Sequence, residues 1–206
     1  MRIEELEVLL TAGAIDRRIG EMASEITRVY DGKRLLVVGV LKGAWIFLAD
    51  LVRRIPADVD VDFIKVSSYG KATESSGEVR FEMDFGRPVE NKHVLVVEDI
   101  VDTGVTLSYL KKNLLTRKPA SLKICALLDK PQRRKAPIDI DFRGFEIPDK
   151  FVVGYGLDCA EHYRNLPFIA ALTQQQGREL SASEGGCHET GKSGKCECGK
   201  LPEHGV

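Results

Sequence analysis

The chain of 206 residues has little surplus charge of either sign, with 30 Lys and Arg against 31 Asp and Glu. A basic surface that would bind nucleic acid or an anionic membrane is therefore not expected, although small anions could still bind through local arrangement. No apolar run approaches the roughly 20 residues of a membrane span, and the first residues, MRIEELEVLL, carry acids where a signal peptide needs basic residues. These absences predict a cytoplasmic protein.

Cysteine is scarce, with five residues, an odd number. Cys125 lies inside the apolar run KICALL, where a buried reduced thiol is expected rather than a disulfide. Hydrophobic residues make up 43% of the chain, which is enough for a real core. We predict one globular domain over residues 1–173.

The segment 174–206 has almost no apolar residues and is rich in Gly, Ser, Glu and Lys, so it is predicted to be a disordered, solvated tail. Its cysteines and histidines leave a zinc site as the alternative, although their spacing matches no standard zinc motif. The candidate ligands are Cys187, His188, Cys196, Cys198 and His204.

Helix and strand patterns alternate along the rest of the chain. Apolar residues recur at helical spacing at Ile15, Ile19, Met22, Ile26 and Val29, which predicts a helix that Asp31-Gly32 ends. Strands are predicted at 34–41, 59–66, 93–98 and 122–128, and further helices at 44–55 and 106–115. This order indicates an α/β fold with a mostly parallel sheet flanked by helices. The small, polar stretch 67–78 is predicted to be a long loop that acts as a lid.

The sequence HVLVVEDIVDTGVTL, residues 93–107, places acids where a predicted strand ends. Ligands bind at the carboxyl ends of the strands in open α/β sheets, which makes the turn Asp102-Thr103-Gly104 a candidate site. The N–H groups of Thr103, Gly104 and Val105, the Thr106 hydroxyl and the positive end of the next helix could surround a phosphate.

Glu98 and Asp99 would repel that phosphate unless they faced another partner. Carboxylates accept hydrogen bonds from sugar hydroxyls and bind hard cations such as Mg²⁺. The stretch therefore predicts a site for a phosphorylated, hydroxyl-bearing sugar. An acidic loop that only caps the helix is the alternative for an isolated DTG sequence, but acids in register with a T-G-x-T turn favour the sugar site.

The segment VVEDIVDTGVTL resembles the phosphoribosyl-pyrophosphate (PRPP) motif of the type I phosphoribosyltransferases, and its acids resemble those of the hypoxanthine-guanine enzymes. The resemblance continues through GVLKGAWIF, SSYG, LLDKP and PDKFVVGYGLDCAEHYRNLP. It implies the type I fold, a twisted and mostly parallel sheet flanked by helices, with a small hood from the terminal segments. It also implies transfer of the phosphoribosyl group of PRPP to hypoxanthine or guanine, with Mg²⁺ as cofactor.

The same resemblance assigns residues to the pyrophosphate of PRPP. Lys42 and Gly43 in the segment LKGA would bind its oxygens, with a cis peptide between Leu41 and Lys42. Arg164 in HYRN would hold pyrophosphate through its planar guanidinium. Taken alone, a Lys-Gly pair after a strand is an ordinary turn, and Arg164 is a solvated surface residue.

For the purine, the resemblance implies that Lys130 reads the exocyclic oxygen of a 6-oxopurine. Phe151 would stack on the base, and the backbone of Val152 would bind its edge. Asp102 would act as general base at N7 of the purine. Alone, Lys130 is a solvated lysine before a proline, and Phe151 and Val152 are more often core residues.

Metal and lid residues complete the implied site. Glu98 and Asp99 would face the ribose and Mg²⁺, and Asp158 would bind a second Mg²⁺ through water. Ser68 and Tyr69 in the lid would close over the pyrophosphate and exclude water, which otherwise competes for the activated sugar.

Other functions on the same fold remain as alternatives. A xanthine or pyrimidine enzyme would share the PRPP motif, but Lys130 with Phe151 and Val152 favours a 6-oxopurine. A PRPP-sensing regulator that binds RNA or DNA is disfavoured by the near-neutral charge. The expected partners are PRPP and 6-oxopurine bases, with no nucleic acid and no membrane, and the resemblance implies a homodimer or homotetramer.

Overall fold

The computed structural model of the chain describes residues 6–69 and 78–173. The middle of the predicted lid, residues 70–77, lies outside the described residues, and so does the segment 174–206 with its candidate zinc ligands. Within the described ranges, no helix has both the length and the apolar character needed to cross a bilayer.

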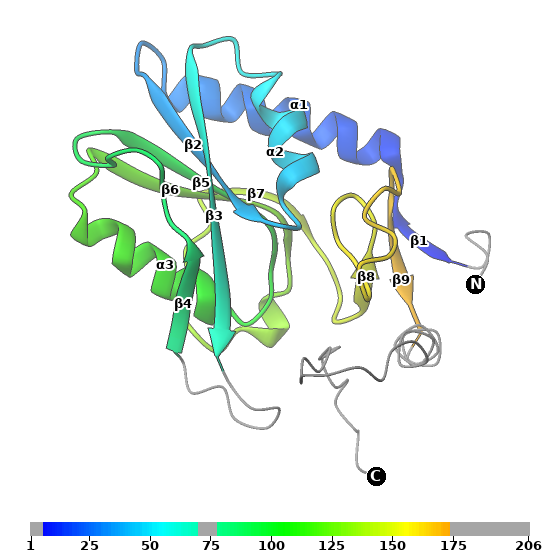
Figure 1. Cartoon of the computed structure of the whole chain (residues 1–206). Helices are drawn as coiled ribbons and strands as arrows, with labels where there is room; N and C mark the ends of the chain where they lie inside the picture. The colour runs from blue at the N-terminus through cyan, green and yellow to red at the C-terminus, as the bar shows by residue number, and fades with distance from the viewer. Residues whose placement is uncertain (1–5, 70–77, 174–206) are drawn as a thin grey trace, which may run out of the picture.

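The centre of the fold is a six-stranded sheet in the order β4-β3-β2-β5-β6-β7 (Figure 1). Neighbouring strands from β3 to β7 pair in parallel, whereas β4 pairs antiparallel with β3. This confirms the predicted α/β class with a mostly parallel sheet. The strands are β2 (Leu35–Leu41), β3 (Val59–Tyr69), β4 (Glu78–Met83), β5 (His93–Val101), β6 (Ser121–Asp129) and β7 (Phe142–Glu146).

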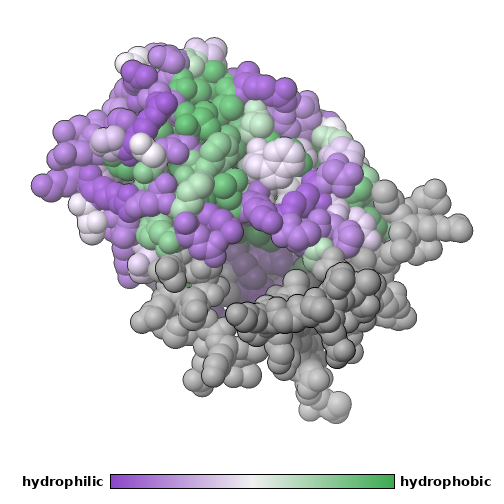
Figure 2. Space-filling view, in the orientation of Figure 1, coloured by the Kyte–Doolittle hydropathy of each residue, from purple (hydrophilic) through white to green (hydrophobic). Residues whose placement is uncertain are grey.

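Helices cover both faces of this sheet, because its strands are apolar on both sides. Helices α1 (Ala12–Val29) and α2 (Trp45–Val52) pack on one face, and α3 (Val105–Thr116) packs on the other (Figure 1). Alternate residues of a strand enter opposite cores: Val37 lies in the core with α1, and Val38 in the core with α3. Figure 2 shows that hydrophilic side chains dominate the outer surface in this view, although an apolar area lies near the top.

Helix α1 follows the predicted pattern closely. The Thr11 side chain caps its first turn by accepting a hydrogen bond from the N–H of Ala14 at 3.3 Å. The predicted apolar stripe is buried except at its end, where Val29 is 41% exposed. The helix ends beside the Asp31-Gly32 turn, as predicted.

The terminal segments form a second, small antiparallel sheet in the order β1-β9-β8, which confirms the predicted hood. Its strands are β1 (Glu7–Leu10), β8 (Phe151–Val153) and β9 (Ile169–Leu172). The hood has a core of its own, which includes Val153, Cys159, Leu166 and Ala170.

Two predicted boundaries are wrong. Residues Ser67 to Tyr69, placed in the lid loop, continue strand β3, and their backbones pair with Arg80 to Glu78 of β4. Ser68 and Tyr69 therefore belong to a strand rather than to a loop. Strand β5 also continues past Glu98 to Val101, because it keeps pairing with β6 through Asp129.

The cysteine prediction is confirmed for the described residues. Cys125 is buried in β6 and forms no disulfide. Burial raises the pKa of its thiol, so this side chain is an unreactive part of the core.

Candidate active site

Three adjacent strands end at the same edge of the sheet and deliver polar residues there. Lys42 follows β2, Asp102 follows β5 and Lys130 follows β6. Because β2, β5 and β6 are parallel neighbours, these residues lie at one edge, as the position of the acidic motif predicted.

The predicted phosphate turn is formed by Gly104 and the start of α3. Gly104 has φ +76°, a left-handed conformation that favours glycine, and a Cβ there would lie 2.8 Å from the carbonyl oxygen of Ala136. Gly104 supplies no capping side chain to α3, and the N–H of Val105 makes a long hydrogen bond of 3.5 Å to Oγ1 of Thr103. Weakly held N–H groups at the start of a helix suit an anion.

The acidic pair lies in β5, just before this turn. Burial raises the pKa of Glu98 well above its usual range, and the nearby Asp99 carboxylate adds to the effect. Burial also raises the pKa of Asp99, although hydrogen bonds from Glu98 and from the N–H of Ile100 oppose the shift. Two carboxyl groups that are costly to ionise together form a site that a divalent cation or hydroxyl groups would stabilise.

Gly43 brings the loop after β2 against this pair. A Cβ at Gly43 would lie 1.6 Å from Oδ2 of Asp99, so a larger residue there would displace the Asp99 carboxylate. Gly156, in the loop after β8, also packs closely on Gly43, since a Cβ at Gly156 would lie 2.1 Å from the Gly43 carbonyl oxygen. The peptide between Leu41 and Lys42 is cis, as the resemblance implied. Figure 1 shows β2 ending beside the hood loops.

The cations assigned to pyrophosphate meet at this junction. Lys42 Nζ lies 2.9 Å from Oε1 of Glu161, and Arg164 Nη2 lies 2.8 Å from Oδ1 of Asp158. Arg164 also contacts Oε2 of Glu161 at 3.2 Å and donates to the carbonyl oxygen of Gly156 at 2.9 Å. The sequence interpretation missed Glu161, because an acid in an irregular loop carries no pattern that marks its partners.

The residues assigned to the base lie around a buried lysine. Lys130 is only 5% exposed, its Nζ donates to the carbonyl oxygen of Lys150 at 2.6 Å, and burial lowers its pKa. A solvated lysine is thereby excluded. Val152 is buried and Phe151 is partly buried, and both are in strand β8 with their backbones in register with β9. The Val152 side chain therefore belongs to the core, and the Phe151 side chain packs against the hood core.

Asp102 carries two contacts that the sequence did not reveal. Its Oδ1 lies 2.9 Å from Nε of Arg133, and its backbone carbonyl accepts a hydrogen bond from Nη1 of Arg134 at 2.9 Å. The charge of Asp102 also acts on Lys130, so the two groups assigned to the purine lie near each other.

Comparisons with known proteins agree with this geometry. The family model described as "Phosphoribosyl transferase domain" matches residues 6–160. The hypoxanthine-guanine phosphoribosyltransferase of Bacillus subtilis is 51% identical over 166 residues, which cover 81% of this chain and 92% of that protein. The chain belongs to the hypoxanthine-guanine phosphoribosyltransferase family, a group of purine-salvage transferases.

Solved structures of phosphoribosyltransferases share the fold. A hypoxanthine phosphoribosyltransferase from Staphylococcus aureus superposes with a TM-score of 0.81 at 49% identity, covering 84% of this chain and 94% of that one. A hypoxanthine-guanine phosphoribosyltransferase from Bacillus anthracis gives a TM-score of 0.79 at 47% identity, covering 82% and 100%.

In this phosphoribosyltransferase the three acids assigned to metal do not form one cluster. No group of at least three potential metal ligands occurs in the part of the chain that the structure describes. Glu98 and Asp99 form one pair, whereas Asp158 pairs with Arg164 and accepts a hydrogen bond from the N–H of Glu161. A cation at either place would need further ligands from substrate or water.

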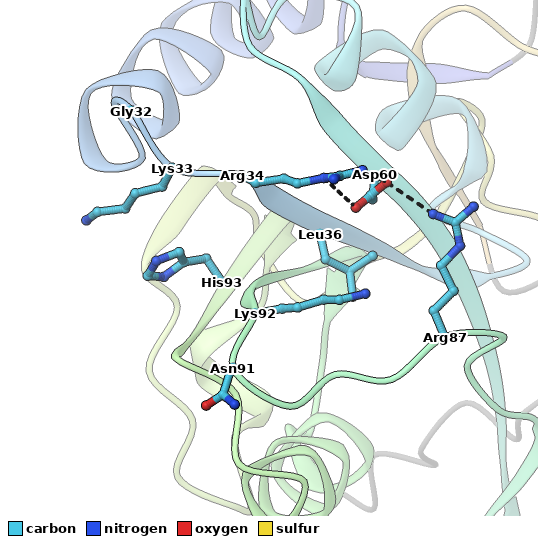
Figure 3. Close-up of a pocket in the computed structure, with 9 residues that line it drawn as sticks. All are labelled: Gly32, Lys33, Arg34, Leu36, Asp60, Arg87, Asn91, Lys92 and His93. Carbon is cyan, nitrogen blue, oxygen red and sulfur yellow. Dashed lines mark hydrogen bonds and ion pairs between the residues drawn. The ribbon is translucent and has the colours of Figure 1, made fainter.

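A separate cavity of about 500 Å³ lies at the opposite edge of the phosphoribosyltransferase sheet, where β2, β3 and β5 begin (Figure 3). Arg34 and Arg87 both bind Asp60, at 3.0 and 3.1 Å. Figure 3 shows Lys92 pointing into the same region, whereas His93 points away. The two arginines that line this cavity are thus paired with Asp60, which also lines it. The cavity contains none of the residues assigned to the site.

Proposed function

We propose that the protein transfers the 5-phosphoribosyl group of PRPP to hypoxanthine or guanine, giving IMP or GMP and pyrophosphate. The observation that carries this proposal is that buried Lys130 lies beside the turn that carries Asp102, since its N–H donates to the carbonyl oxygen of Val101 at 2.9 Å, just before the start of α3. The exocyclic oxygen and N7 lie on one edge of a 6-oxopurine, so a lysine that donates to the oxygen and an acid that handles the N7 proton must be neighbours.

The phosphate of PRPP binds at the turn before α3. The N–H groups of Thr103, Gly104 and Val105 and the hydroxyl of Thr106 donate to its oxygens, and the helix dipole adds favourable electrostatics. Residues 105 and 106 begin α3 itself, so their positions are fixed by the helix.

Glu98 and Asp99 hold the ribose side of the substrate. Mg²⁺ fits this pair, because desolvation raises the pKa of both partly buried carboxyl groups and a hard cation as counter-charge would offset the cost of ionising them. Bound Mg²⁺ would neutralise charge on the PRPP pyrophosphate as it leaves. Asp158, whose Oδ1 lies 2.8 Å from Nη2 of Arg164, would hold a second Mg²⁺ through water.

The leaving pyrophosphate is bound by the loop after β2 and by the hood. Attack on the anomeric carbon develops positive charge on the sugar and negative charge on the leaving group, so donors placed beforehand at the leaving group lower the barrier. Lys42 and Arg164 supply the cations, and Gly43 lets the backbone approach closely. Ser68 and Tyr69, at the end of β3, are positioned at the base of the segment proposed to close over this group.

The purine is held by Lys130 at its exocyclic oxygen, by Phe151 through stacking and by Val152 through its backbone. Asp102 takes the proton from the base as the new bond forms. Lys130 is already desolvated, so its ammonium needs little rearrangement to exchange the Lys150 carbonyl for the purine oxygen. A cytoplasmic location and a dimeric or tetrameric assembly stay predictions from the sequence.

One assay tests the proposal. Parallel reactions contain the purified protein, PRPP, Mg²⁺ and one base each: hypoxanthine, guanine, xanthine or uracil. Nucleotide formation is followed in every reaction. We expect turnover with hypoxanthine or guanine and little with uracil. Preference for xanthine or uracil would overturn the assignment of Lys130 to a 6-oxopurine.

A further inference from the structure

The segment that follows η2 (Pro131–Arg133) runs along the turn that carries Asp102. The N–H groups of Lys135 and Ala136 both donate to the carbonyl oxygen of Thr103, at 2.9 and 3.1 Å. The last residue of η2 and the three that follow it, residues 133–136, are here called the strap, which holds the Asp102-Gly104 turn through the backbone.

Arg134 anchors the strap to the core. It donates from Nη1 to the Asp102 carbonyl at 2.9 Å and binds the carboxylate of Asp129 with Nη2. Asp129 is only 3% exposed, and Arg143 lies 3.0 Å from its other oxygen. A buried carboxylate with two guanidinium partners is a rigid anchor, because breaking either contact leaves charge uncompensated in the interior.

Arg133 acts on the Asp102 carboxylate itself. Its Nε lies 2.9 Å from Oδ1, an ion pair that lacks the alignment of a hydrogen bond. Oδ1 has almost no exposed surface, while the Asp102 side chain as a whole is 40% exposed. The accessible side of the carboxylate is therefore the side turned away from Arg133.

The same arginine reaches toward the second purine-reading group. Arg133 Nη1 lies 3.3 Å from Oδ1 of Asp149, and that oxygen lies 3.9 Å from Lys130 Nζ. Arg133 thus links the acid assigned to N7 with the lysine assigned to the exocyclic oxygen. A side chain that is 35% exposed can hold this bridge without itself being part of the core.

We propose that Arg133 and Arg134 are positioning residues for the proton transfer at the purine. Arg134 fixes the backbone of Asp102, and Arg133 fixes its carboxylate so that the accessible oxygen faces the base. Neither arginine touches the reacting atoms; both act through Asp102. This inference rests on the proposed role of Asp102, so its test measures that role separately.

The test compares Arg133→Gln, Arg133→Lys, Asp102→Asn and the double variant Asp102→Asn with Arg133→Gln. Arg133 is chosen because Arg134→Gln would leave the buried Asp129 short of a partner and could unfold the protein. We expect Arg133→Gln to lower kcat about tenfold to a hundredfold, the range for a misplaced catalytic group, with KM for PRPP little changed. Arg133→Lys keeps a cation beside the carboxylate and should recover part of the loss.

The double variant gives the decisive result. If Arg133 acts through Asp102, Arg133→Gln should lower kcat much less in the Asp102→Asn background than in the wild type. Arg34→Gln is the matched control, because it also removes an arginine from an aspartate, at the edge of the sheet opposite the site (Figure 3). It should leave kcat unchanged.

Three outcomes would overturn the proposal. Arg133→Gln with wild-type kcat, beside a slow Asp102→Asn, would show that the carboxylate needs no positioning. If Arg133→Gln lowered kcat equally in the wild type and in Asp102→Asn, Arg133 would act on a group other than Asp102. Wild-type kcat in Asp102→Asn would instead remove the general-base role and with it the group to be positioned. Thermal melts of every variant show whether a loss of activity is a loss of folded protein.

Discussion

Lys42 and Glu161, 119 residues apart in the chain, form an ion pair of 2.9 Å between Nζ and Oε1. The other oxygen of Glu161 lies 3.2 Å from Arg164. Glu161 thus neutralises both cations proposed to bind pyrophosphate, and the two cations in turn hold the pKa of Glu161 below its usual range. An anionic substrate group must compete with this carboxylate for its partners.

Glu161→Gln is therefore expected to tighten pyrophosphate binding. The variant keeps the shape of the side chain but frees the charge of Lys42 and Arg164. Because exposed ion pairs contribute little, we expect a decrease of roughly two- to fivefold in the inhibition constant for pyrophosphate and in KM for PRPP. Initial rates with added pyrophosphate measure both. Weaker binding would mean instead that Glu161 holds the cations in their productive positions, and Glu21→Gln, which removes an exposed partner of Arg18, is the control.

The partly buried pair Glu98 and Asp99 predicts an opposition between stability and substrate binding. Folding raises the pKa of Glu98, so the folded chain binds this proton more tightly than the unfolded chain. The stabilisation is complete below the unfolded pKa, near 4.3 for a glutamate, and is lost as the pH rises through the folded pKa. Glu98→Gln cannot ionise and should avoid this loss.

Without ligands, Glu98→Gln should melt about 3 °C or more above the wild type at pH 8, but not at pH 4.5. The same variant should bind PRPP more weakly, because it lacks the carboxylate proposed to face the ribose and Mg²⁺. Calorimetric melts at both pH values and KM for PRPP check the two halves. Equal melting shifts at pH 4.5 and pH 8 would contradict the assigned cause, and Glu90→Gln, at an exposed position, should shift neither.

The sequence predicted the elements of the central sheet because their apolar patterns are local. Strand β2 and helix α1 have such patterns, and the structure confirms both. The end of β5 was placed too early, since Glu98 and Asp99 have the composition of a loop but continue the pairing with β6. Ser67 to Tyr69 were taken for a loop for the same reason: their strand character comes from pairing with β4, which a local pattern does not contain.

Candidate site residues within a recognisable motif could be proposed from the sequence, whereas residues that join the site only through contacts could not. The acidic motif and the resemblance located Lys42, Asp102 and Lys130. Glu161 lies in a segment that carries the resemblance but was assigned no role there, and Arg133 lies outside those segments; the contacts of both are with residues far along the chain. The burial of Lys130 was also invisible, because a lysine before a proline normally lies in solvent.

Removal of divalent metal should abolish turnover and weaken PRPP binding. Asp99 opposes the ionisation of Glu98, and desolvation raises the pKa of both groups, so an anionic substrate gains little from them unless a cation comes between. EDTA should stop nucleotide formation, and excess Mg²⁺ should restore it. Titration of PRPP with and without Mg²⁺ tests binding directly. Activity undiminished by EDTA would remove the metal from the proposed site.

The last prediction is that a chain ending at Gln176 keeps its melting temperature and its kcat. Every described residue assigned to the site lies between Lys42 and Arg164, and the hood closes with β9 at Leu172. Beyond Leu180 the sequence offers only Leu201 and Val206 as large aliphatic residues, too few to build a core that offsets the entropy of ordering. The rival hypothesis is a zinc site formed by the three cysteines and two histidines after residue 186. Metal analysis of both chains separates the two: about one zinc per full-length chain, absent after truncation, would support the rival, and a parallel fall in kcat would show that the segment serves the active site.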